Sequence, residues 1–316
     1  MLISVCIPTR NRIAMLKEAL RSAMDQDCSD CEIVVSDNAS TDGSGDWVSN
    51  FGGGRVRLLR QVSNIGSVAN HNACVRAAFG QWILFLHDDD LLRDGGMRLV
   101  VDFLRKHEAC DVALPDYMGW LLKGEVFDNC LKLLNGISMS STLFRRDLLV
   151  QFPFHTDNVC CDWEVLFQSA LHGRRLCTYP FDLIERRHHP GQEGALVAFD
   201  GRGIIGKTNA VRRLCAQFTN NDWLRLCERI VSSWQTDQIM SLARFVHNSG
   251  YRDHFSILRD LARAHNKWRR ASKQGAVILA EGLFGLSITS QFLRPWKAWN
   301  RRRHYSHSRR SLHRTK

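Results

Sequence analysis

Residues 82–90 read Trp-Ile-Leu-Phe-Leu-His-Asp-Asp-Asp, an apolar run that ends in three aspartates. A short, continuous apolar run of this kind is typical of a strand that is buried on both faces. Three adjacent carboxylates repel one another, and a folded protein tolerates them best when a cation lies among them. The segment therefore predicts a buried strand with a divalent-metal site at its end. A solvated acidic turn is the alternative interpretation of the triplet taken alone.

The sequence before this segment alternates between strand-like and helix-like patterns. Strands are expected at 3–8, 32–36 and 56–59, and helices at 12–26 and 68–79. This succession predicts an α/β fold with a Rossmann-like, mostly parallel sheet flanked by helices. Ligands bind such sheets at the carboxyl ends of the strands. Polar clusters follow strands at 8–11, 37–42 and 87–90, so we expect them to converge on one site.

Three further motifs precede the triplet in a fixed order. They are Val-Cys-Ile-Pro-Thr-Arg-Asn-Arg at 5–12, Asp-Asn-Ala-Ser-Thr-Asp-Gly at 37–43, and Asn-Ile-Gly-Ser-Val-Ala-Asn-His-Asn at 64–72. Each motif is common alone, but the ordered set resembles the inverting family 2 glycosyltransferases with the GT-A fold, over about residues 2–190. The resemblance implies an enzyme of the hexosyltransferase class that uses a nucleotide-sugar and a D-x-D metal motif.

The resemblance also implies a set of site residues. Those that bind the nucleotide-sugar are Pro8, Thr9, Arg10, Asn11, Asp37, Asn64, Gly66, Asn70 and Asp88. Those that bind the metal, Mn²⁺ or Mg²⁺, are Asp89, Asp90 and His188. Asp37 can accept the imide N–H of uracil or thymine, and family frequency favours a UDP-sugar over a dTDP-sugar. Many relatives carry an acid in place of His87, so the direct metal ligand among the three aspartates is left open.

A later acidic motif, Cys-Cys-Asp-Trp-Glu at 160–164, resembles the family segment in which an aspartate opens a helix and acts as general base. Apolar residues after it recur at helical spacing, and Gly173 suits the end of that helix. Asp162 is the residue implied as base, with Glu164 as a weaker substitute. An aspartate at a helix start is also a common cap, which is the alternative. Residues 186–191 resemble a basic segment that closes over the donor diphosphate, where His188 or His189 could touch phosphate or metal; a charged surface turn is equally compatible.

Charge is distributed unevenly along the chain. Residues 1–200 hold 20 Lys and Arg against 26 Asp and Glu, whereas residues 201–316 hold 23 against 6. We expect a GT-A domain at 1–204 and a helical, basic C-terminal extension at 205–316. Within that extension, about 274–303 combines an apolar run with Trp and Arg, which is typical of an amphipathic segment on an anionic membrane surface. A packed core helix or a solvated tail are the alternatives.

These features predict the partners and the location. We expect peripheral association with the cytoplasmic face of the cell membrane. The acceptor is then a saccharide or lipid-linked saccharide of cell-surface polysaccharide or lipopolysaccharide biosynthesis. No nucleic-acid partner is expected, because the sequence offers neither aromatic stacking platforms nor a reading helix. A catalytically inactive protein that only binds a nucleotide-sugar is the alternative function.

The eleven cysteines do not predict a disulfide framework. Their number is odd, and the first residues, Met1–Pro8, lack the basic leader of a secretory signal and predict a strand instead. Cys28 and Cys31 form a C-x-x-C without a second pair at zinc-binding spacing. We expect buried or idle thiols in a reducing cytosol.

Overall fold

The computed structural model describes residues 1–116 and 139–187, together with 189, 192, 206, 209, 210, 213 and 214. They belong to one of two compact units of the chain, formed by Met1–Val197 and Arg202–Ile230. The predicted domain boundary at 204 and the predicted membrane segment at 274–303 lie outside the described residues. Within the described part of the chain, every helix falls short of the length and apolar character needed to cross a bilayer.

The first ninety residues contain all the predicted elements, with ends that differ by one or two residues. They are β1 (Ile3–Thr9), α1 (Ile13–Met24), β2 (Cys31–Asp37), β3 (Val56–Arg60), α3 (Ser67–Ala77) and β4 (Trp82–Phe85). One further helix, α2 (Ser44–Phe51), was not predicted. The second half adds β5 (Asp90–Leu92), α4 (Gly96–Lys106), β6 (Val112–Pro115), the 3-10 turn η1 (Met139–Ser141), β7 (Leu143–Arg145), α6 (Arg146–Gln151), α7 (Cys161–Leu171), β8 (Leu176–Tyr179) and β9 (Ile184–Arg186).

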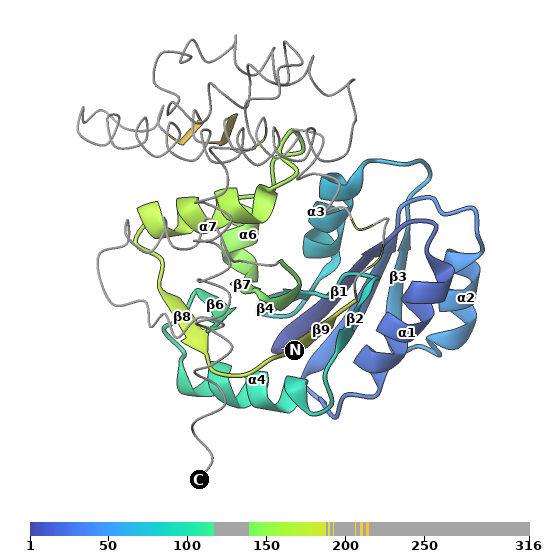
Figure 1. The fold of residues 1–316 in the computed structure, drawn as a ribbon, viewed down its shortest axis with the longest axis horizontal. Coiled ribbons are helices and arrows are strands. Elements are labelled where there is room, and N and C mark those ends of the chain that lie inside the picture. Colours follow the sequence, from blue (N-terminus) through green and yellow to red (C-terminus); the bar gives the residue numbers. More distant parts are fainter. Residues whose placement is uncertain are drawn as a thin grey trace, which may run out of the picture. The chain divides into compact units, whose positions relative to one another are not determined.

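The main sheet has seven strands in the order β3-β2-β1-β4-β7-β6-β8 (Figure 1). Strands β1 to β4 run parallel, and β6 is parallel to β8. Only β7 runs antiparallel to its neighbours in this sheet, and a separate antiparallel pair joins β5 to β9. The prediction of a mostly parallel sheet flanked by helices is therefore confirmed.

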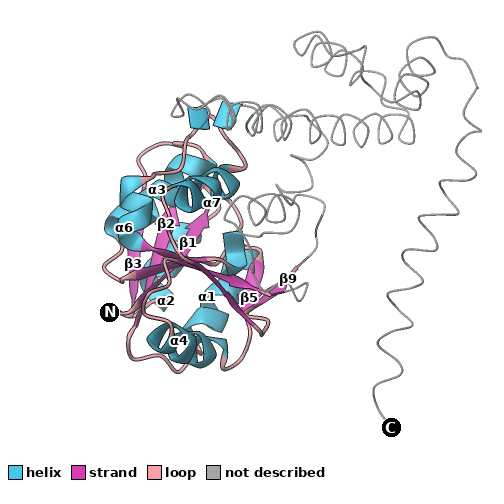
Figure 2. Cartoon of the chain, turned by 90° about the vertical axis from the view of Figure 1, so that its left-hand side faces the viewer, coloured by secondary structure: helices cyan, strands magenta, loops and turns pink. Residues whose placement is uncertain are grey.

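Helices cover both faces of this sheet (Figure 2). Alternate residues of each parallel strand enter two separate hydrophobic clusters, as the two-residue period of a strand requires. On β1, for example, Val5 belongs to one cluster and Cys6 to the other. The first cluster includes side chains of α1, α2 and α4, and the second includes side chains of α3, α6 and α7. Because both faces of the sheet are covered, the central strands β1 and β4 are mostly apolar, and the polar clusters follow the strand ends.

A buried polar network joins the amino ends of the parallel strands. Glu32 at the start of β2 accepts hydrogen bonds from the Ser4 hydroxyl (2.5 Å) and from the Gly80 N–H (3.1 Å), and it pairs with Arg57 of β3. Gly80 lies so close to β1 that a Cβ there would stand 2.5 Å from the Ser4 nitrogen. The glycine is thus required by the close approach of two backbones.

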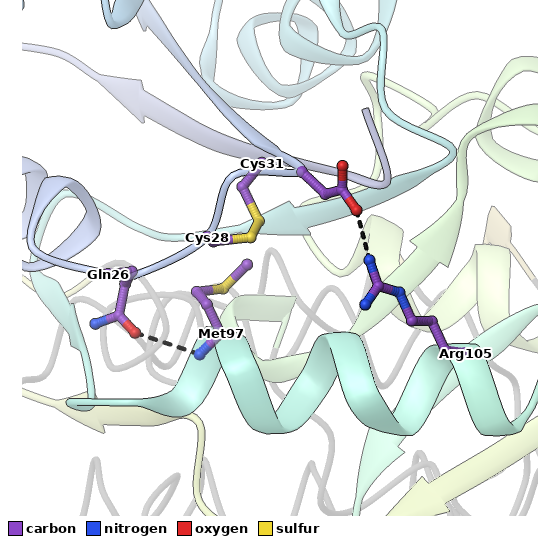
Figure 3. The surroundings of a disulfide bond; sticks show 6 residues. Gln26, Cys28, Cys31, Met97 and Arg105 are labelled. Carbon is purple, nitrogen blue, oxygen red and sulfur yellow. Dashed lines mark hydrogen bonds and ion pairs between the residues drawn. A yellow bond between two sulfur atoms is a disulfide. The ribbon is translucent and has the colours of Figure 1, made fainter.

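A disulfide lies at this same amino edge, between Cys28 and Cys31, whose Cα atoms are 5.4 Å apart (Figure 3). The prediction of idle thiols is wrong for this pair, because the turn into β2 brings the two side chains together. Neighbouring contacts tie the turn to α4: Met97 N–H donates to Gln26, and Arg105 pairs with Asp30 at 2.6 Å. The other cysteines of the described part of the chain that carry no disulfide are Cys6, Cys74, Cys110, Cys160, Cys161 and Cys177.

Candidate functional site

The carboxyl ends of β1, β2 and β4 bring three polar clusters to one edge of the sheet. Thr9 and Asp37 are the last residues of β1 and β2 and pair directly in register. The Thr9 hydroxyl donates to Asp88, which follows β4, at 2.7 Å. The convergence expected from the strand order is therefore present in the structure.

The loops after β1 and β2 are locked to each other by Asn11. Its backbone N–H donates to the Ser40 hydroxyl at 2.9 Å, and its side-chain oxygen accepts from the Thr41 N–H at 2.8 Å. Asn11 adopts a left-handed φ of 51°, which Asn tolerates better than most residues. Pro8, near the end of β1, is buried, whereas Arg10 in the loop is exposed. The predicted nucleotide loop is thus pre-shaped by its own hydrogen bonds.

The segment before α3 joins the same edge through amide side chains. The Asn38 amide donates to the Asn64 oxygen at 2.9 Å, and its own oxygen accepts from the Ile65 N–H. Gly66 precedes α3 with a φ of 87°, a conformation that favours glycine. Asn70 is 2% exposed and exchanges two hydrogen bonds with Ser36 of β2. Asn70 therefore holds α3 against the sheet.

The three aspartates are nearly buried, with exposures of 4% for Asp88, 5% for Asp89 and 3% for Asp90. A single guanidinium, that of Arg12, bridges the first two at 3.0 Å and 3.1 Å. Burial raises the pKa of Asp88, although Arg12 and Thr9 oppose that rise. Burial also raises the pKa of Asp90 against its hydrogen bond with Ser140. Burial thus opposes the ionisation of these two acids, so their anionic forms need positive partners.

Asp89 differs from Asp88 and Asp90 in the direction of its net pKa shift. Burial alone would raise the pKa of Asp89, but a hydrogen bond with His189 and electrostatic interactions with His87 and Arg12 lower it below its ordinary value. The His189 Nε2 lies 2.9 Å from the Asp89 carboxylate. Asp89 is thus the member of the triplet held most firmly as an anion.

A small sheet carries the basic segment to the acids. In the β5–β9 pair, Asp90 lies opposite Arg186, so the next residues of the chain cross the triplet. Arg187 donates to the backbone carbonyls of Asp89 (2.7 Å) and Asp88 (3.1 Å), and it pairs with Glu18 of α1. Arg187 and His189 of the basic segment therefore contact the acid triplet directly. His188, the predicted metal ligand, lies outside the described residues.

The donor set fits a divalent cation. His87, Asp89 and Asp90 each offer a ligand atom, and these atoms lie within 4.8 Å of one another. Carboxylate oxygens suit Mg²⁺ and Mn²⁺, and an imidazole nitrogen suits first-row transition ions. Asp89 and Asp90 would hold such an ion, which would supply positive charge to a bound diphosphate.

The first turn of α7 holds two acids in different settings. Asp162 is half-buried in that turn. Glu164 is 2% exposed, accepts from the Asn158 amide at 2.9 Å and pairs with Arg213 at 2.7 Å. Because its oxygens already serve this structural network, Glu164 does not fit the role of substitute base that the sequence left to it.

Three contributors were missed by sequence reasoning. Arg12 ends the first motif, but an arginine in a loop usually indicates only a solvated charge. Nothing in the sequence around it predicts that it bridges two aspartates. Arg187 belonged to the basic segment without a role. Ser140 had no signal, because a lone serine far along the chain carries no pattern.

The matching family model is described as Glycosyl transferase family 2 and covers residues 4–126. The GalNAc(5)-diNAcBac-PP-undecaprenol beta-1,3-glucosyltransferase of Campylobacter jejuni is 37% identical over 98 residues, 30% of this chain and 32% of that protein. A PGL/p-HBAD biosynthesis glycosyltransferase of Mycobacterium bovis is 33% identical over 173 residues, 51% of this chain and 66% of that protein. The chain thus spans only about a third of the first relative's length and about two thirds of the second's.

Among solved structures, the mannosyltransferase PcManGT from Pyrobaculum calidifontis, in complex with GDP-Man and Mn²⁺, has a TM-score of 0.60 at 18% identity. The similarity covers 94% of this chain and 82% of that one. This likeness concerns the fold. The matched family model and the relatives show that the chain belongs to the family 2 glycosyltransferases, and the sheet order and the solved structure show the GT-A fold.

Proposed function

We propose that the chain is an inverting glycosyltransferase that moves a sugar from a nucleotide-sugar, with UDP favoured, to an acceptor hydroxyl. The observation that carries the proposal is the buried Asp88–Asp90 cluster at the carboxyl edge of the sheet, met there by Arg12, Arg187 and His189. Such a concentration of opposite charges suits a diphosphate and its metal ion.

Each part of the edge has a role in this proposal. Asp37 accepts the imide N–H of the base, and the loop at 8–11 covers the base and ribose. Asp88, hydrogen-bonded to Thr9, lies beside the ribose and diphosphate. Asp89 and Asp90 would hold Mn²⁺ or Mg²⁺, which would offset the charge of the departing diphosphate. The Mn²⁺ bound in the Pyrobaculum structure favours Mn²⁺.

Asp162 is the proposed general base. It takes the proton of the acceptor hydroxyl while that oxygen attacks the anomeric carbon, and the nucleotide leaves from the opposite face. The configuration at that carbon is therefore inverted. The position in the first turn of α7 gives the carboxylate a fixed backbone on which to act.

Substitution of the base tests this role. Asp162→Asn should lower kcat for transfer from a UDP-sugar with Mn²⁺ by about 10²- to 10⁴-fold, while the affinity for UDP, measured by calorimetry, stays within about threefold. Asp147→Asn is the matched control, because Asp147 also lies in the first turn of a helix, α6. Equal loss of activity in both variants, or none in Asp162→Asn, would contradict the role.

The donor is best identified by thermal stabilisation. A nucleotide-sugar that binds the folded chain raises its Tm by mass action. We expect UDP-sugars with Mn²⁺ to raise the Tm more than GDP- or dTDP-sugars do. A Tm that rises while transfer to every acceptor stays at background would favour the inactive nucleotide-sugar-binding protein instead.

The proposed acceptor is a lipid-linked saccharide at a membrane surface. The name of the Campylobacter relative contains PP-undecaprenol, and residues 263–316 hold 14 Lys and Arg with one acid, Glu281. Sedimentation with vesicles of anionic lipid should retain the full chain at low salt and release it at high salt. Equal sedimentation of the chain with neutral and with anionic vesicles would contradict the membrane proposal, while the proposed transfer chemistry would stand.

A further inference from the structure

Two histidines and a serine form a continuous chain of contacts beside the acid cluster. The His71 Nδ1 lies 2.9 Å from the Ser67 carbonyl oxygen, and its Nε2 lies 3.3 Å from the Nε2 of His87. The other ring nitrogen of His87, Nδ1, lies 2.9 Å from the Ser140 hydroxyl. These residues come from α3, from the turn after β4, and from η1, so the contacts join three segments that are distant in the sequence.

The contacts determine which nitrogen of each neutral ring carries the proton. A carbonyl oxygen only accepts, so the His71 Nδ1 is the protonated nitrogen and its Nε2 bears a lone pair. The contact between the two Nε2 atoms needs one donor, which must then be His87. The Nδ1 of His87 is left with a lone pair.

The nitrogen with the lone pair is the one that does not contact His71. The Ser140 hydroxyl lies 2.9 Å from it. His87, Asp89 and Asp90 each offer a ligand atom, and these atoms lie within 4.8 Å of one another. A cation held among them would accept the His87 lone pair together with the oxygens of the two carboxylates.

We propose that His87 is a direct ligand of the divalent ion through Nδ1, beside Asp89 and Asp90, and that His71 is the residue that fixes its tautomer. A ligating imidazole that donates its other N–H to a fixed acceptor is the usual arrangement of a metal-bound histidine. This inference rests on the proposed function, because the ion is the one that serves the diphosphate.

The ligand set has a consequence for metal choice. Mg²⁺ prefers oxygen ligands alone, whereas Mn²⁺ accepts an imidazole nitrogen. We therefore expect the full chain with UDP to bind Mn²⁺ at least about 10-fold more tightly than Mg²⁺. His87→Asp makes all three ligands oxygen donors. In this variant we expect the ratio of Mn²⁺ affinity to Mg²⁺ affinity to fall to about that of a site built from carboxylates alone.

Pulsed electron paramagnetic resonance of Mn²⁺ bound to the full chain with UDP tests the ligand directly. A coordinated imidazole gives ¹⁴N modulation, which should change when the wild-type chain is labelled with ¹⁵N-histidine. This labelling needs no substitution and so does not depend on a variant that folds. The modulation should vanish in His87→Asp and persist in His189→Gln, which distinguishes His87 from the histidine that contacts Asp89.

Further variants separate positioning from folding. His71→Gln should weaken Mn²⁺ binding by about 10- to 100-fold. His172→Gln should leave it unchanged, although His172 makes the same Nδ1 contact with a carbonyl one turn earlier, that of Gln168 at 2.9 Å. Circular dichroism confirms that each variant is folded.

Mn²⁺ bound without histidine nitrogen, or nitrogen modulation lost in His189→Gln instead, would overturn the inference and leave the proposed function standing. A chain that binds no Mn²⁺ also overturns it. In that case transfer from a UDP-sugar in the presence of a chelator decides the proposed function separately.

Discussion

Each buried carboxylate of the acid cluster has partners from distant parts of the chain. Asp88 is met by Thr9 and Arg12, and Asp89 by Arg12 and His189, across sequence separations of 76 to 100 residues. An uncompensated buried charge costs several kcal/mol. These contacts therefore keep a site of dense negative charge compatible with the fold until a cation and a diphosphate are present.

Gly80 shows a residue-scale constraint of a different kind. Gly80→Ala should lower the free energy of unfolding by about 3 kcal/mol, because the added Cβ meets backbone atoms of Ile3 and Ser4 that cannot move aside. Gly54→Ala is the control: its φ of 81° is unfavourable for Ala, but no atom lies within 4 Å, so about 1 kcal/mol is expected. Urea unfolding followed by circular dichroism measures both. A smaller loss in Gly80→Ala than in Gly54→Ala would contradict the close approach.

At the scale of elements, one carboxylate serves the starts of two helices. The residues that precede α1 and α2, Arg12 and Gly43, make no side-chain cap. Asp42 supplies the side-chain cap of both helices: its carboxylate accepts from the Ile13 N–H at 2.9 Å and from the Ser44 N–H at 3.1 Å. An anion at two helix starts also suits both helix dipoles. Asp42 therefore fixes the two helices that follow the predicted nucleotide loops.

Asp42→Ala should lower the free energy of unfolding at pH 7 by about 1 kcal/mol, a typical cap loss reduced by the exposure of the carboxylate. The control Asp46→Ala removes an exposed pair with Arg60 and should change stability by less than about 0.5 kcal/mol. Denaturant unfolding measures both.

The same variant has a defined pH dependence. Burial tends to raise the pKa of Asp42, but hydrogen bonds with Ser44 and Ile13 lower it below its ordinary value. A lowered folded-state pKa means that the contribution is complete above the unfolded Asp pKa of about 3.9 and is lost as the pH falls through the folded value. The stability gap between wild type and Asp42→Ala should therefore close on acidification below about pH 4. A gap that is constant from pH 7 to pH 3 would contradict the carboxylate cap.

In the described unit as a whole, the two edges of the sheet have different tasks. Strand β2 begins at Cys31, beside the disulfide, and ends at Asp37 in the candidate site. Seven strand residues place these ends about 20 Å apart. The amino edge carries the disulfide and the Glu32 network, and the carboxyl edge carries the polar clusters. We expect perturbations at one edge to leave the other largely unaffected.

The double variant Cys28→Ser/Cys31→Ser tests this separation. Loss of a disulfide that closes so short a loop should reduce the free energy of unfolding by about 2 kcal/mol or less. UDP affinity and kcat should stay within about twofold of the wild-type values. Thermal unfolding with and without a thiol reductant measures the first effect, and the variant serves as its own control because the reductant should not affect it further. Loss of nucleotide binding in a folded double variant would show that the two edges are coupled.

Local sequence patterns were sufficient for the elements that form the frame of the site. Strands β1 to β4 are short, mostly apolar runs, helices α1, α3 and α7 carry apolar residues at helical spacing, and each polar cluster directly follows a strand. Parallel strands bring such clusters to one edge, so Asp37 and Asp88 could be placed together in advance. Helix α2 was not predicted, because Gly45, Ser49 and Asn50 give it a weak helix propensity. It forms because the Asp42 cap and packing against the sheet stabilise it.

Only the tertiary structure decided which side chains meet. The antiparallel insertion of β7, the disulfide, the Arg12 bridge and the arrival of His189 at Asp89 all depend on partners chosen across long stretches of chain. A sequence pattern records how often a residue faces the core, because burial repeats with the period of the helix or strand. It carries no record of the distant residue that completes a hydrogen bond, since that choice depends on how the elements pack together.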